Sequence, residues 1–200
     1  MTVKCLVVEG VPFRDCLTID TGKARTAADM LCFAELIPDA SALSTAVRII
    51  WRFERGMVQL NAAAPTPEQV CECYSRHQNL RRFLSLGSKV VKSGIRGGAG
   101  TWAAIGYWIA QKNETGAADE FMARLAMGNN LDTGHPILTL RNKLLSTKKT
   151  KFRPVEIAAF AFKAWNALRA GSKMHVLRYQ AGQDDFPFPI GNPEPGEGET

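Results

Sequence analysis

Residues 154–171 read PVEIAAFAFKAWNALRAG, and this stretch decides how the rest of the chain is organised. Proline at its start and glycine at its end predict a helix over 154–170. Apolar residues surround this helix and leave only a narrow polar strip of Glu156, Lys163 and Asn166. Because a helix that is apolar almost all round must be covered on several sides, we expect it to be the structural centre of a multi-helix protein.

Start and stop signals predict helices along most of the remaining sequence. Thr26 is expected to cap a helix that runs through Leu36, with Asp29 completing a shortened capping box. Further helices are expected over about 40–55, 67–77, 79–92, 101–112, 117–127 and 136–146. Branched apolar residues predict short strands over Val3–Glu9 and Met174–Tyr179. The expected fold class is therefore mainly α, a compact array of about eight or nine helices with a short strand near each end.

The charge of the chain is unevenly distributed. Residues 183–200 carry five acidic and no basic residues, and their proline and glycine content predicts a disordered tail after a single helical domain over 1–182. The remaining residues hold 25 basic and 14 acidic side chains, a net charge of +11. Such a basic body favours an anionic partner, although a solvated surface that keeps the protein in solution explains the charge equally well.

Several classes of protein are not supported by the sequence. No apolar run approaches about 18 residues, and the N-terminal apolar stretch is too short for a secretory signal, so we expect a cytoplasmic protein without a membrane span. The cysteines are odd in number and irregularly spaced, and the histidines stand far apart, so we expect reduced thiols and neither a metal site nor a cofactor. No nucleophile, metalloprotease or nucleotide-binding motif is present, and we expect no catalysis.

Two groups of basic residues are candidates for contacts with nucleic acid. Arg48, Arg52 and Arg55 recur at helical spacing opposite an apolar face, which suits a phosphate backbone but equally suits a solvated helix face. Lys148, Lys149, Lys151 and Arg153 lie in a predicted loop between two helices, where all four charges can reach solvent together.

The segment DTGKART, residues 20–26, precedes a predicted helix start. Backbone N–H groups there can hold an anion, which makes Asp20, Thr21, Gly22, Lys23 and Arg25 candidate ligand-binding residues. The alternative is an Asx-type turn that leads into the Thr26 cap.

Four segments of this sequence resemble phage and actinobacterial proteins described as ParB-like. They are DTGKART, AVRIIWRFERG (46–56), EFMARLAMGNNLDTGHPILTLRNKLL (120–145) and RPVEIAAFAFKAWNALRAGSKMHVLRYQAG (153–182). Proteins of that type carry a DGQHR signature in an N-terminal ParB/sulfiredoxin-like domain, followed by a helical region. No DGQHR occurs here, so the resemblance is to the helical region, with residues 1–25 as a remnant of the first domain.

The resemblance implies that Asp20, Thr21, Gly22 and Arg25 line a ligand or nucleic-acid surface. Together with the charge it leads us to expect a non-catalytic, phage-encoded DNA-associated protein of ParB-like type, acting electrostatically in the cytoplasm of a bacterial host. The alternatives are a module that binds a host or partner protein, or a remnant of a nucleotide-handling DNA-modification enzyme. We also expect the first strand to pair with the closing strand or with another chain, because an open strand edge favours a partner.

Overall fold

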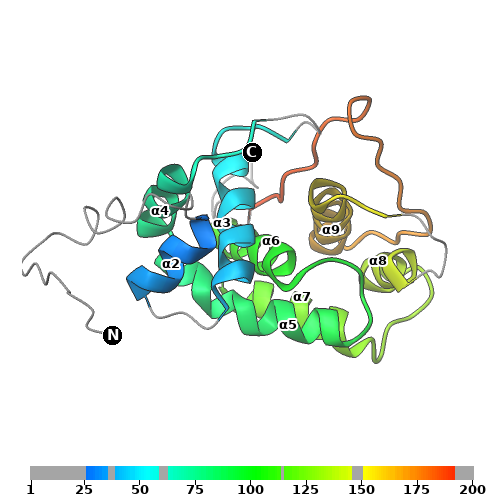
Figure 1. The fold of residues 1–200 in the computed structure, drawn as a ribbon. Coiled ribbons are helices and arrows are strands. Elements are labelled where there is room, and N and C mark those ends of the chain that lie inside the picture. The colour runs from blue at the N-terminus through cyan, green and yellow to red at the C-terminus, as the bar shows by residue number, and fades with distance from the viewer. Residues whose placement is uncertain (1–25, 36–38, 59–62, 114, 146–150, 192–200) are drawn as a thin grey trace, which may run out of the picture.

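The computed structural model describes residues 26–35, 39–58, 63–113, 115–145 and 151–191. The described part is mainly helical, which confirms the mainly α class but not the two short strands, and it contains eight α-helices and one 3₁₀ helix (Figure 1). Their bounds are α2 Ala27–Glu35, α3 Ala40–Glu54, α4 Pro67–Arg76, η1 Gln78–Arg82, α5 Phe83–Lys92, α6 Ala99–Lys112, α7 Thr115–Met127, α8 Pro136–Leu145 and α9 Pro154–Arg169.

Local capping sets several helix ends, as the sequence predicts. The Thr26 hydroxyl accepts a hydrogen bond from the Asp29 N–H at 3.2 Å, and the Asp29 carboxylate accepts one from the Thr26 N–H at 2.9 Å. Thr66 and Gln69 form the same reciprocal pair at the start of α4. These bonds satisfy backbone donors that the first helical turn leaves without partners, so the helices begin there.

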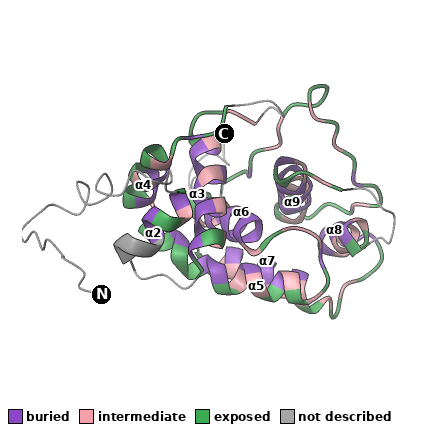
Figure 2. Ribbon diagram, viewed as in Figure 1, coloured by how far each residue is buried: buried purple, intermediate pink, exposed green. Residues whose placement is uncertain are grey.

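The centre of the fold is α6, and not α9 as the sequence suggested. Figure 1 shows α6 lying between α3 and α9, and helices α5 and α7 also pack against it. Every residue over 100–107 is buried (Figure 2). Glycines allow the close approach: a Cβ on Gly100 would lie 2.2 Å from the carbonyl oxygen of Ala42 in α3. A larger residue there would push the two helices apart.

The helix α9 is nevertheless buried along most of its length. It packs on α6 and α8, and its Trp165 ring meets Phe121 of α7 edge-on at a centroid distance of 5.5 Å. The polar strip predicted from the sequence is where the C-terminal segment lies, since Asn166 and Lys163 both bond to that segment. An apolar helix can therefore be covered from one side by irregular chain as well as by helices.

The segment after α9 differs from its prediction in two ways. No strand forms over Met174–Tyr179, where the chain is irregular and backbone groups bond to a loop residue and to a helix side chain. The Met174 N–H donates to the Gly134 oxygen at 2.7 Å, and Lys163 donates to the Arg178 oxygen at 2.7 Å. The first predicted strand, Val3–Glu9, lies outside the described residues, so its expected pairing stays a prediction.

The predicted disordered tail is packed against the protein over 183–191. This segment, orange to red in Figure 1, returns toward α3. Phe186 lies 5.7 Å from Phe53 of α3 and 5.9 Å from Phe162 of α9, between ring centroids. The contacts of the half-buried Phe186 ring stabilise a segment whose composition suggested disorder. Residues 192–200 lie outside the described part.

No helix in the described ranges is both long enough and apolar enough to cross a lipid bilayer.

Candidate functional site

A pocket lies between α3 and the start of α9. Its volume is about 270 Å³. Three arginines and Thr45 supply its polar side, and apolar side chains supply the rest. The lining residues are Thr45, Arg48, Ile49, Arg52, Phe53, Ala64, Pro65, Arg153, Pro154 and Val155. The volume is slightly below the roughly 300–1,000 Å³ of small-molecule sites, which suits one anionic group and the part of a ligand next to it.

The two helices bring the arginines together from positions about a hundred residues apart. Arg48 and Arg52 are one turn apart on α3, so their side chains share a face. Arg153 is the N-cap residue of α9, where backbone N–H groups and the helix dipole favour a negative charge. Three guanidinium groups and a helix N-terminus therefore border one cavity.

Arg48 has a hydrogen-bond donor that its surroundings leave without an acceptor. Its Nε is buried, and no partner for it exists among the described residues. A buried donor without a partner destabilises the folded chain by about 1–3 kcal/mol, and more when the group is charged.

The other basic residues predicted to contact nucleic acid are placed differently. Arg55 turns away from the pocket: its guanidinium lies 4.2 Å from the ring centroid of Trp51, and its Nη1 lies 3.5 Å from the carboxylate of Glu54. Lys151 is exposed, two residues before Arg153. Lys148 and Lys149 lie outside the described residues, as do the candidate ligand-binding residues Asp20, Thr21, Gly22, Lys23 and Arg25.

The sequence did not point to the apolar side of the pocket. Ile49, Phe53 and Val155 are apolar residues, and each is buried. Pro65 also lines the pocket, although it precedes a capping residue and carries no functional signal of its own. These residues become part of a site only because α3 and α9 meet. In the sequence, only the spacing of the basic residues indicated a site here.

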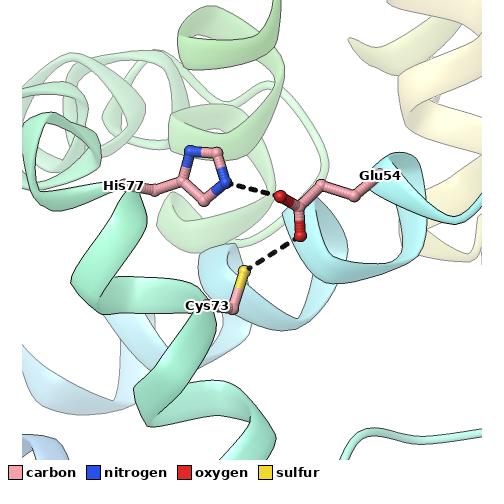
Figure 3. Close-up of side chains that lie close together, drawn as sticks. All are labelled: Glu54, Cys73 and His77. Carbon is pink, nitrogen blue, oxygen red and sulfur yellow. Dashed lines mark hydrogen bonds and ion pairs between the residues drawn. The ribbon is translucent and has the colours of Figure 1, made fainter.

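A second group of polar side chains lies where α3 meets α4 (Figure 3). Glu54 ends α3, and its Oε1 lies 2.9 Å from the His77 Nε2. Its Oε2 lies 3.6 Å from the Cys73 Sγ and 3.1 Å from an Arg76 nitrogen. On the other side of the imidazole, the Nδ1 of His77 lies 2.8 Å from the Tyr107 hydroxyl of α6.

The electrostatics of this group follow from burial and pairing. Burial would raise the pKa of Glu54, but hydrogen bonds from His77 and Arg76 outweigh it, and the pKa lies below the ordinary value of 4.5. Burial raises the pKa of Cys73 to about 12, and the negative charge of Glu54 adds to the effect. Cys73 is therefore a protonated thiol on its own at neutral pH and a poor nucleophile.

This group contains residues that the sequence analysis set aside. The separation of the histidines argued against a metal site, yet Cys73 and His77 are four residues apart and fall on one face at the end of α4. That cysteine–histidine spacing was the available signal. The third member, Glu54, could not be found from sequence, because it comes from another helix.

No family model, curated protein or solved structure matches this chain. The ParB-like resemblance therefore stays a prediction.

Proposed function

We propose that the protein binds nucleic acid, and double-stranded DNA in particular, through the face formed by α3 and the start of α9. One observation carries the proposal: Arg153, from the basic loop, borders the same pocket as Arg48 and Arg52 of α3. The two basic groups that the sequence treats separately thus share one surface. Guanidinium groups are the preferred partners of phosphate oxygens, because their N–H donors match the oxygens in pairs.

In this proposal one backbone phosphate occupies the pocket. The guanidinium of Arg48 donates to it, and Arg153 and the α9 N-terminus add positive potential. The exposed Lys151 reaches a neighbouring phosphate along the strand. Such contacts fix the position of a duplex without reading its bases, so the binding is not sequence-specific. The protein would act in the cytoplasm of a bacterial host, as the ParB-like resemblance implies.

Fluorescence anisotropy with a labelled duplex of about 30 base pairs, at low and near-physiological salt, tests the proposal. The site variant is the double substitution Arg52→Ser and Arg153→Ser. The matched control is Lys92→Ser with Lys112→Ser, which removes the same charge from exposed helix ends elsewhere. We expect affinity to fall steeply with salt, and the site variant to lower the slope of log affinity against log salt by about 2.

Three outcomes of this experiment distinguish the possible functions. Weakening in the site variant but little change in the control supports a phosphate site at this pocket. Equal weakening in both variants shows a general charge effect and rejects the pocket. Absence of binding at low salt rejects the nucleic-acid proposal, and binding of an acidic peptide in the same assay would then favour a protein-interaction module.

A further inference from the structure

We propose that Glu54, Cys73 and His77 form a binding site for a single divalent transition-metal ion of the zinc class (Figure 3). The site is separate from the arginine-lined pocket and does not depend on nucleic-acid binding. In the part of the chain that the structure describes, these are the only three side chains of metal-binding type whose ligand atoms gather in this way, all within 4.8 Å of one another.

The three ligand atoms lie within 4.8 Å of one another, so small movements would bring them to the spacing of tetrahedral coordination. Bond lengths of about 2.0–2.3 Å from zinc to nitrogen, oxygen and sulfur place neighbouring ligand atoms about 3.3–3.8 Å apart. The separation from the Cys73 Sγ to the Glu54 Oε2 is 3.6 Å, and that from the His77 Nε2 to the Glu54 Oε1 is 2.9 Å. Small rotations of the side chains would therefore create room for the ion between them.

The identity of the ligands selects the class of metal. A thiolate and an imidazole are ligands that zinc and similar ions prefer, whereas magnesium and calcium prefer oxygen ligands alone. One carboxylate and one thiolate would balance the double charge of the ion. Three protein ligands leave a fourth position for water, as in zinc sites that remain open.

Two further side chains, those of Tyr107 and Arg76, are placed to hold the ligands in position. Histidine ligands of metals commonly donate their second ring N–H to a fixed acceptor, which sets the ring orientation. Tyr107 is placed for this role: its oxygen lies 2.8 Å from Nδ1, and its ring meets the imidazole edge-on. Arg76 lies 3.1 Å from the Glu54 Oε2, so it would hold the carboxylate in place beside the ion.

The three ligands differ in their exposure to solvent. Cys73 is fully buried, whereas the side chains of His77 and Glu54 are 15% and 24% exposed. An ion could enter past the carboxylate, and the Cys73 thiol would lose its proton on binding. Occupation would tie the end of α3 to the end of α4.

Titration of the full chain without an affinity tag, stripped of metal by a chelator, with cobalt(II) tests the proposal. Cobalt bound to a thiolate gives a charge-transfer absorption band in the near ultraviolet, so the spectrum reports the Cys73 bond itself. We expect one equivalent to bind to the wild-type chain. Cys73→Ser should abolish the band, and Tyr107→Phe should weaken binding about tenfold through the lost outer-shell contact.

The matched control is Cys71→Ser, which removes a half-buried thiol two residues away on the same helix. It should bind cobalt as the wild type does, and circular dichroism should show that every variant is folded. Zinc should compete for the cobalt and raise the melting temperature of the wild type but not of Cys73→Ser. No band in the wild type, or a band that survives in Cys73→Ser, would overturn the proposal.

Discussion

Single residues in this protein are affected by charges on neighbouring helices, and His135 illustrates the electrostatic consequence. His135 precedes α8, where its Nδ1 lies 3.2 Å from the Ile137 N–H. Its Nε2 lies 3.1 Å from a nitrogen of Arg124 in α7. Burial lowers the pKa of His135 below its ordinary value of 6.5, and the positive charge of Arg124 adds to the effect. The folded protein therefore favours the neutral imidazole.

The His135 environment predicts a loss of stability in mild acid. Because the pKa of His135 is lower in the folded than in the unfolded state, its contribution is present above about pH 6.5 and is lost as the pH falls through the folded pKa. We expect the free energy of unfolding to fall more between pH 7.5 and 5.5 in the wild type than in His135→Gln. Urea denaturation of both proteins at both pH values measures this difference. An equal fall in the free energy of unfolding in the two proteins would contradict the prediction.

Individual helices begin where the sequence provides a cap, and α4 shows this most clearly. Thr66 and Gln69 exchange hydrogen bonds of 3.3 and 3.0 Å, and Pro67 occupies the first helical position. All these interactions link residues at most three apart, so they do not depend on the rest of the fold. The same helix carries Cys73 and His77, which makes its start relevant to the proposed metal site.

Removal of the α4 cap should have a defined effect on stability. Thr66→Ala leaves the Gln69 N–H without its acceptor, and we expect the free energy of unfolding to fall by about 1 kcal/mol. Thr66→Ser keeps the hydroxyl and should stay within about 0.5 kcal/mol of the wild type. Chemical denaturation of the three proteins makes the comparison. A loss of the same size in both variants would show that the hydroxyl is not responsible.

The molecule as a whole is closed by its C-terminal segment. Asn166 of α9 binds this segment twice, accepting from the Ile190 N–H at 2.9 Å and donating to the Phe188 oxygen at 3.0 Å. The side-chain amide of Asn113 at the end of α6 also donates to the Ile190 oxygen. Phe186 packs between rings of α3 and α9. The segment thus contacts α3, α6 and α9 and covers part of the surface of each helix.

These contacts of the C-terminal segment predict that Phe186 stabilises the fold, although it lies outside every helix. Phe186→Ala removes a half-buried ring and should lower the free energy of unfolding by about 1–2 kcal/mol. Val176→Ala, in the same irregular region, truncates a side chain that is 63% exposed and should change it by less than about 0.5 kcal/mol. Thermal and urea denaturation compare the variants. A Phe186→Ala protein as stable as Val176→Ala would mean that the segment contributes little.

The sequence by itself determined the helical class and most helix boundaries, because caps, prolines and terminal glycines act over three or four residues. It also marked Arg48 and Arg52 in one basic group and Arg153 in another. Only the tertiary structure decided that α6 rather than α9 is central, because close approach at Gly100 depends on which helices meet there. Packing likewise ordered residues 183–191 and gathered the arginines into one pocket. It also placed Glu54 beside a cysteine and a histidine about twenty residues away. Such contacts depend on how whole elements bury their apolar faces together, and no local pattern encodes that.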